Sequence, residues 1–275
     1  MNGIKAKKHL GQNFLKNSKI LEIIVGDASL ENIHTIEVGP GPGDLTREIL
    51  NRNPLSTTLI ELDSDMIPLI QNRFQGYHFT VYQNDVLNIN ITHGDSSNLK
   101  KGIHVIRDSK IITLPQYNIY GNIPYYITSP ILHHFFYDVE LSPEVATFTM
   151  QKEVANRILD TKNHTVLSLS CQLVSKVEKV CDISPHNFTP VPKVWSTCLR
   201  FTKIESPTTE DPKKILGLIK KGFLQKRKKL TSNLIHSGYS HEQISAVFQK
   251  LDLSENIRAE ELSLEQWKTL YANIK

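Results

Sequence analysis

A glycine-rich loop lies between a short apolar run and a helical pattern. It reads Glu37-Val-Gly-Pro-Gly-Pro-Gly43, so its glycines have the spacing G-x-G-x-G. Glycines let a backbone approach a ligand closely and expose the amides at a helix N-terminus. A dinucleotide fingerprint would need a third glycine at position 44, where Asp44 stands instead. With an acid nearby and no basic residue in the loop, a cofactor without phosphate, such as S-adenosylmethionine, is the better fit, and a structural turn is the alternative.

Two acidic residues follow the next two apolar runs. Glu61 lies 22 residues beyond the first glycine of the loop, where a carboxylate can accept hydrogen bonds from two ribose hydroxyls. Asp85 follows the third run and could accept a hydrogen bond from an adenine amino group. Asp63 and Asp65 compete with Glu61, but both could instead cap the helix expected over residues 66–73. Glu61 is favoured because it lies nearest the end of its predicted strand.

The tetrapeptide Asn122-Ile-Pro-Tyr125 follows another apolar run. An exocyclic adenine amine is a poor nucleophile because its lone pair is delocalised into the ring. The carboxamide oxygen of Asn122 and a backbone carbonyl beside it could accept both N–H groups of that amine, while Tyr125 stacks on the base. The amine nitrogen would then be pyramidal and could attack a methyl sulfonium in line, without a covalent nucleophile, losing its proton to water afterwards. An ordinary turn with a proline after a strand is the alternative.

Short apolar runs that alternate with helical patterns must position these motifs. This alternation predicts an α/β fold with a parallel sheet and helices on its faces, whose ligands bind at the carboxyl ends of the strands. The helix that follows the glycine loop is expected over residues 45–50. Residues 92–112 are expected to form a surface loop or insertion. The predicted strands are residues 34–38, 57–61, 79–82, 117–120 and 145–149.

The last third of the chain changes character. A long helix is expected over residues 165–180 and a strand over residues 196–202. Residues 205–212, polar and with two prolines, predict a linker and a domain boundary. Three helical patterns then indicate a small helical domain, over residues 215–223, 241–251 and 264–271.

Composition restricts the class of protein. The 275 residues are 39% hydrophobic and 22% charged, which excludes collagen, coiled coil and wholesale disorder. No apolar run approaches the roughly 20 residues of a membrane span, and the basic N-terminus leads into polar residues, so a cytoplasmic protein without a signal peptide is expected. The three cysteines form no C-x-x-C pair, so neither a disulfide framework nor a metal site is expected.

The net charge is only +4, but the positive charges are concentrated in two basic segments. Residues 1–20 hold five lysines and no acid, and residues 213–229 hold eight cations and no acid. Such patches suit a polyanion, since each neutralised phosphate releases counterions. Lysine-rich solvated faces without a partner are the alternative for either patch.

Seven short motifs follow one another along the chain: 12–15 (QNFL), 37–41 (EVGPG), 60–63 (IELD), 84–86 (NDV), 122–125 (NIPY), 151–153 (QKE) and 188–193 (FTPVPK). In this order they resemble the KsgA-type ribosomal RNA adenine dimethyltransferases. The resemblance extends through the basic segment 225–230 and Asn233, and so covers nearly the whole chain. No single motif is decisive, but seven in order are highly specific.

The resemblance implies a class I S-adenosylmethionine-dependent methyltransferase, with a Rossmann-like seven-stranded sheet and a small C-terminal all-α domain. Residues 1–204 would be the catalytic domain, with a basic lid segment at 1–20, and residues 205–275 a helical RNA-binding domain. The implied reaction transfers methyl groups from S-adenosylmethionine to N6 of two adjacent adenosines in the last hairpin loop of small-subunit (16S) rRNA. The protein would thereby take part in biogenesis of the small ribosomal subunit.

The resemblance also assigns residues. The cofactor would lie against Asn13, Leu15, Gly39, Gly41, Glu61, Asp85 and Asn122. The amine pocket would be formed by Asn122, Pro124 and Tyr125, with Phe188 stacking opposite Tyr125 on a flipped base. For Phe188 the alternative is a core aromatic before a proline turn. The rRNA would be held by residues 5–15 acting as a lid and by a set of cations: Lys7, Lys8, Lys226, Arg227, Lys228 and Lys229.

Three other interpretations stay open. The nearest is the erythromycin-resistance type of dimethyltransferase, which acts on large-subunit rRNA and shares the core motifs, but residues 188–193 and the basic segment favour the small subunit. A non-catalytic RNA-binding assembly factor is the second, although the intact Asn122, Pro124 and Tyr125 oppose it. A nicotinamide oxidoreductase is disfavoured because Asp44 breaks the fingerprint. A monomer without metal or membrane partner is expected.

Overall fold

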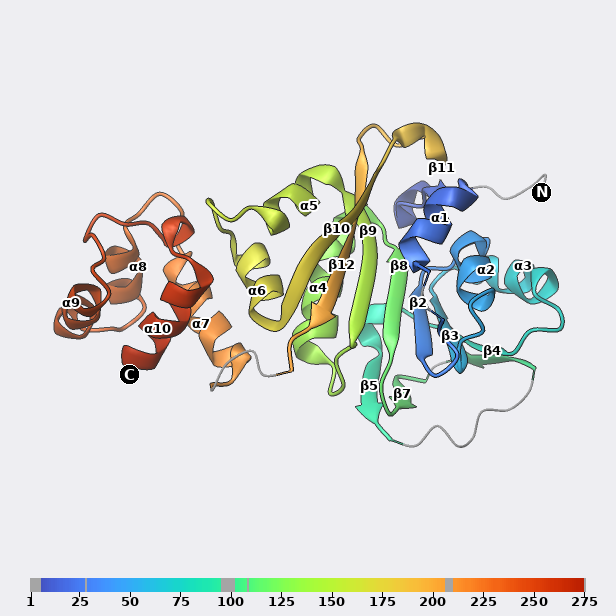
Figure 1. The fold of residues 1–275 in the computed structure, drawn as a ribbon, viewed down its shortest axis with the longest axis horizontal. Coiled ribbons are helices and arrows are strands. Elements are labelled where there is room, and N and C mark those ends of the chain that lie inside the picture. The colour runs from blue at the N-terminus through green and yellow to red at the C-terminus, as the bar shows by residue number, and fades with distance from the viewer. Residues whose placement is uncertain (1–5, 28, 95–101, 108, 206–209, 275) are drawn as a thin grey trace. The chain divides into compact units, whose positions relative to one another are not determined.

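The computed structural model describes residues 6–27, 29–94, 102–107, 109–205 and 210–274 (Figure 1). The chain forms two compact units, each interrupted in sequence. The first comprises Met1–Ala155 and Glu178–Lys203, and the second comprises Asn156–Val177 and Ile204–Lys275. Residues 156–177 thus join the C-terminal helices in this division. The predicted functional boundary at residue 205 remains a prediction.

A mixed β-sheet forms the centre of the first unit. Its described strands have the order β10-β12-β9-β8-β2-β3-β4-β6. Their bounds are β2 (His34–Val38), β3 (Ser56–Glu61), β4 (Phe79–Gln83), β6 (Ile103–Arg107), β8 (Asn118–Asn122), β9 (Val145–Gln151), β10 (Ser175–Ile183) and β12 (Ser196–Lys203). The pairs from β6 to β9 are parallel, and β12 runs antiparallel to β9. The five strands predicted up to residue 149 and the strand at 196–202 are confirmed.

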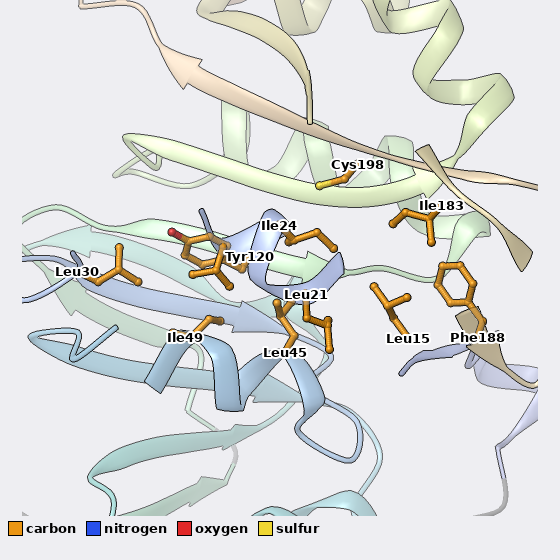
Figure 2. Close-up of a cluster of buried hydrophobic side chains, with 11 residues drawn as sticks. Leu15, Leu21, Ile24, Leu30, Leu45, Ile49, Tyr120, Ile183, Phe188 and Cys198 are labelled. Atoms are coloured by element: carbon orange, nitrogen blue, oxygen red, sulfur yellow. The ribbon is translucent and has the colours of Figure 1, made fainter. Parts of the chain in front are cut away.

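Helices bury the sheet. All five residues of β2 are buried, as expected of a central parallel strand covered on both faces. One cover is the pair α1 (Ser18–Val25) and α2 (Asp44–Leu50), whose apolar residues share a core cluster with β8 and β12 (Figure 2). The remaining helices of this unit are α3 (Met66–Arg73), α4 (Thr128–His133), which runs into the π-helix His134–Asp138, and α5 (Lys152–Leu159), whose last residues belong to the second unit.

Two predictions about these elements are wrong. The helix expected over residues 165–180 ends early: α6 (Val166–Val174) gives way to β10, because the β-branched Val177 and Val180 favour an extended strand beside β12. Residues 92–112 are not simply a loop. They contain β6, an eighth strand at the sheet edge, and parts of β5 (Asn90–His93) and β7 (Ile111–Leu114), which pair in parallel; residues 95–101 and 108 lie outside the described part.

The second unit is helical. The three predicted C-terminal helices are confirmed as α7 (Pro212–Gly222), α9 (His241–Lys250) and α10 (Leu264–Asn273), and α8 (Leu230–His236) is a fourth that was not predicted. Trp267, on α10, is fully buried. A Cβ on Gly222 would lie within van der Waals overlap of the Trp267 ring, so α7 and α10 can pack closely only with glycine there. In the described part of the chain, no helix is long and apolar enough to cross a membrane.

Candidate functional site

A pocket opens at the carboxyl ends of β2, β3, β4 and β8. β3 and β8 lie on opposite sides of β2, so the order of the strands reverses at β2. Open α/β sheets bind ligands at the carboxyl ends of the strands beside such a reversal. The lining comes from five stretches of the chain, within residues 10–15, 37–45, 60–62, 84–86 and 122–127, and from Leu21. The lining includes nine of the ten residues predicted for cofactor and amine: Asn13, Leu15, Gly39, Gly41, Glu61, Asp85, Asn122, Pro124 and Tyr125.

Three glycines of the loop, Gly39, Gly41 and Gly43, have a left-handed backbone, and the first two line the pocket. Gly39 has a φ of 64° and Gly41 a φ of 54°, values that residues with a Cβ rarely adopt. A Cβ on Gly41 would lie 2.8 Å from the ring of Phe14, so glycine lets the N-terminal segment close over the loop. A Cβ on Gly39 would meet nothing within 4 Å. The loop therefore touches protein at Gly41 and leaves open space beside Gly39.

Glu61 joins the end of β3 to this loop. Its carboxylate accepts hydrogen bonds from the amides of Gly41 (3.0 Å) and Asp63 (2.7 Å). Burial raises the pKa of Glu61, and these two hydrogen bonds oppose the rise. Each oxygen has a second lone pair for a ligand. Glu61 thus fixes the loop as well as bordering the pocket, a role that the sequence did not reveal.

Glu37 is a second buried carboxyl group of the pocket wall. It accepts a hydrogen bond from Thr46 Oγ1 (2.6 Å), and burial raises the pKa of Glu37 to about 8. No function was predicted for it. The available signal in the sequence was an acid within a predicted strand, at the start of the glycine loop.

Asp85 and Asn84 form the turn after β4. The Asp85 carboxylate accepts from the amide of Leu87 (3.0 Å), and the Asp85 amide donates to the Asn84 side chain (2.8 Å). The backbone N–H of Asn84 in turn donates to the backbone carbonyl of Glu61 (3.1 Å). The two acids predicted to border the cofactor are therefore held by one connected turn.

Asn122 is fixed by the N-terminal segment. Its carboxamide nitrogen donates to the carbonyl of Asn13 (2.7 Å), which leaves the carboxamide oxygen to accept from a ligand. The carbonyl of Pro124 accepts from the amide of Ile127 (3.2 Å) and keeps one lone pair. The Tyr125 hydroxyl lies 2.6 Å from Ser196 Oγ, and burial raises the pKa of Tyr125. The amide and the ring predicted to hold an adenine thus have fixed positions.

Phe188 lies elsewhere. Its side chain is only 2% exposed and belongs to the core cluster, where Figure 2 shows it beside Leu15 and Ile183. The backbone supports this position, because Phe188 faces Leu15 where β1 (Phe14–Leu15) pairs with β11 (Phe188–Thr189). In this structure the ring is a core aromatic before a proline turn and not part of the pocket lining.

The basic N-terminal segment is tied to acids of the pocket rim. Lys7 Nζ forms ion pairs with Asp63 (2.5 Å) and Asp65 (2.7 Å), and Gln12 donates to Asp63 (2.9 Å). Asp63 is therefore an anchor for this segment. Lys7, predicted to bind RNA, is engaged within the protein, whereas the neighbouring Lys8 is exposed. Lys5 lies outside the described residues.

Asp44 makes a second tie. Lys16 Nζ lies 2.6 Å and Arg73 2.9 Å from its carboxylate. Burial raises the pKa of Asp44, but the two cations outweigh it and lower the pKa below the usual value. The residue that breaks the dinucleotide fingerprint thus anchors the segment that covers the pocket.

In the second unit, the predicted RNA-binding cations Lys226, Arg227, Lys228 and Lys229 lie in the turn between α7 and α8. All four are exposed. Their positive charges are suited to a polyanion. Among the described residues, no group of three or more histidines, cysteines or acids could hold a metal ion.

The model of one protein family, "Ribosomal RNA adenine dimethylase", matches residues 3–275. The chain belongs to this family. Members of the ribosomal RNA adenine dimethylase family are methyltransferases, for which S-adenosylmethionine is the implied methyl donor. The acceptors of Glu61, Asp85 and Asn122 and the open space at Gly39 fit such a donor.

Individual relatives agree with this membership. The "Ribosomal RNA small subunit methyltransferase A" of Prochlorococcus marinus (strain AS9601) is 36% identical over 97% of this chain and 95% of its own length. The protein of that name in Mycoplasmopsis synoviae (strain 53) is 32% identical over 97% and 96%.

Two solved structures share the fold of the dimethylase family. The 23S rRNA methyltransferase ErmE has a TM-score of 0.72 at 22% identity, covering 95% of this chain and 99% of its own. A dimethyladenosine transferase from Plasmodium falciparum has a TM-score of 0.72 at 24% identity, covering 93% and 95%. The α/β class I methyltransferase fold is confirmed, and its described sheet has eight strands, one more than the seven expected, with β6 at one edge.

Proposed function

We propose that this chain dimethylates N6 of two adjacent adenosines in the last hairpin loop of small-subunit rRNA, using S-adenosylmethionine, during biogenesis of the small ribosomal subunit. One observation carries the proposal. Asn122, Pro124 and Tyr125 line the same pocket as Gly39, Glu61 and Asp85. An amine held by the first set would therefore lie beside a donor held by the second.

The donor would be held by the first wall of this pocket. Glu61 would accept from ribose hydroxyls and Asp85 from the adenine amino group, while Gly39 leaves room for backbone contact. When bound, the donor supplies an electrophilic methyl group on a sulfonium. The buried carboxylate of Glu61 suits a cationic ligand, because a nearby anion stabilises positive charge in a site of low dielectric.

The second wall would activate the amine. Asn122 Oδ1 would accept one amine N–H and the Pro124 carbonyl the other, so that the nitrogen lone pair points toward the methyl group. Tyr125 would stack on the flipped base. The proton lost after transfer passes to water. The monomethylated amine has only one N–H left, so the second transfer would use only one of these two acceptors.

A large-subunit activity is the second candidate, because ErmE has the same TM-score as the dimethyladenosine transferase. Several relatives with "small subunit" in their names, at 31–36% identity over nearly the whole chain, favour the first candidate. A substrate in the small ribosomal subunit would place the protein in the cytoplasm. We expect the protein to act there as a monomer.

The deciding experiment transfers labelled methyl groups from S-adenosylmethionine to small subunits that lack the modification, with large subunits and DNA alongside. Mass spectrometry of the nucleosides should find dimethyladenosine only in the small subunit. Asn122→Ala should lower the rate at least about 100-fold, while the exposed Asn72→Ala should not. Label in the large subunit would select the second candidate, and no label with tight RNA binding would indicate a non-catalytic assembly factor.

A further inference from the structure

We propose that Trp195 is a stacking platform for an unpaired RNA base that neighbours the methylated adenosine. This inference rests on the proposed function and names an additional substrate contact for the same site. Trp195 lies immediately before β12 and is 50% exposed, in contrast to the fully buried Trp267, the other tryptophan of the chain. An exposed indole offers a π-face that any nucleobase can stack on.

The ring is held in place by a cation. Lys152 Nζ lies 5.4 Å from the centroid of the indole ring, within the range of a cation–π interaction. The same ammonium group pairs with Asp182 (3.0 Å), and the Lys152 amide donates to the Trp195 carbonyl (2.9 Å). Backbone and side chain of Trp195 are thus both fixed, which reduces the entropy lost when a base stacks on the ring.

Trp195 precedes, in the chain, a residue that contacts the amine pocket. Its chain neighbour Ser196 lies with its hydroxyl 2.6 Å from the hydroxyl of Tyr125, the residue proposed to stack on the target base. Adjacent Cα atoms are about 3.8 Å apart, so the indole begins one residue from that contact. The dimethylated positions are proposed to be adjacent nucleotides of a hairpin loop, and a base flipped out of the loop stack exposes its neighbour. Trp195 is placed to receive that neighbour.

The surroundings of the ring contain the exposed apolar residues Val191 and Val194 as well as several cations, and the cations favour RNA as the partner. Lys193, two residues before Trp195, is exposed, and Lys152 and Lys179 lie around Asp182. An aromatic platform interleaved with cations is the usual arrangement for unpaired nucleic acid, because the cations neutralise phosphates while the ring stacks on a base.

The test compares Trp195→Ala, Trp195→Phe and a matched control, Tyr77→Ala. Tyr77 is another exposed aromatic of the first unit, at the turn before β4 and outside the pocket lining. In methyl transfer to small subunits, Trp195→Ala should raise KM for the subunit about tenfold, leaving kcat and KM for S-adenosylmethionine within about twofold. Trp195→Phe should keep KM for the subunit close to the wild-type value, and Tyr77→Ala should have the same KM and kcat as wild type.

A second readout does not depend on turnover. Because Trp267 is buried, iodide should quench the fluorescence of Trp195 selectively, and Trp195→Phe should remove that quenchable signal. An RNA hairpin carrying the two adenosines should protect wild-type protein from iodide, whereas a fully paired RNA of equal length should not.

The outcomes separate the two proposals. No methyl transfer by wild type would overturn the proposed function itself. Methyl transfer by wild type with an unchanged KM in Trp195→Ala, or unprotected fluorescence in the hairpin complex, would overturn the stacking role alone. Failure of Trp195→Phe to rescue KM would also overturn it, because the ring face would not be the group that matters.

Discussion

Two basic segments look alike in the sequence and differ in the structure. In the first, Lys7 and Lys16 are neutralised by Asp63 and Asp44 at the rim of the pocket. In the second, Lys226 to Lys229 are exposed in the turn between α7 and α8. The first segment therefore uses two of its lysines to hold a covering over the pocket and leaves Lys8 exposed, whereas the four cations in the turn of the second segment are all exposed. Clustered lysines by themselves do not indicate a nucleic-acid surface.

Among the substitutions that test this comparison, Asp44→Ala should cause the largest change in the free energy of unfolding. It would leave Arg73 and Lys16 without their shared carboxylate, at a position where the aspartate side chain is only 11% exposed. Breaking such a buried pair should lower the free energy of unfolding by about 3 kcal/mol, measured by urea denaturation. The matched control is Asp65→Ala, whose side chain is 69% exposed, with an expected loss below about 1 kcal/mol. Equal losses would show that the tie at Asp44 is no stronger than a surface pair.

Glu37→Gln tests the acidic wall of the same pocket. In the folded protein the pKa of Glu37 is about 8, above the usual glutamate value of 4.5, so the folded protein binds a proton there that the unfolded chain has released. The stability of wild type should therefore fall as pH rises from about 4.5 to 8, by up to a few kcal/mol, and the Glu37→Gln substitution should remove that part of the fall. Denaturation of both proteins at about pH 5, 7 and 9 measures the difference. Parallel curves would contradict the buried neutral carboxyl group.

Arg227→Glu with Lys228→Glu tests the exposed segment. Affinity for the rRNA hairpin should weaken at least about tenfold, and the slope of log affinity against log salt should decrease by about 2. S-adenosylmethionine binding should not change. The control reverses the same charge at Lys213 and Lys214, exposed at the start of α7. An unchanged salt slope in the Arg227→Glu, Lys228→Glu variant would contradict an RNA contact at the turn. An equal loss of RNA affinity in the control would show that the turn contributes no more than other exposed lysines.

Lys7→Ala and Lys8→Ala form the finest test, because neighbouring lysines differ in their partners. Loss of Lys7 should loosen the covering segment and weaken S-adenosylmethionine binding about threefold, with an unchanged salt slope for RNA. Loss of Lys8, which is exposed, should leave cofactor binding unchanged and reduce the salt slope by about 1. Calorimetry and a salt titration measure the two quantities. The reverse pattern would assign the RNA contact to Lys7.

The sequence by itself determined the central strands of the sheet and the location of the site. Strands such as His34–Val38 are short apolar runs that end at glycine or polar turns, and both signals are local. Once the strands are parallel, their carboxyl ends meet, so Gly39, Glu61, Asp85 and Asn122 had to lie at one edge.

Only the tertiary structure decided which partners these residues have. The spacing of Val177 and Val180 is that of one helix face, whereas their β-branched side chains favour a strand, and pairing with β12 selected the strand. The burial of Phe188, the bond from Asn122 to Asn13 and the ion pair of Lys7 with Asp63 each join segments far apart in the chain. Such contacts depend on how the elements pack, and a local pattern of residue types does not contain that information.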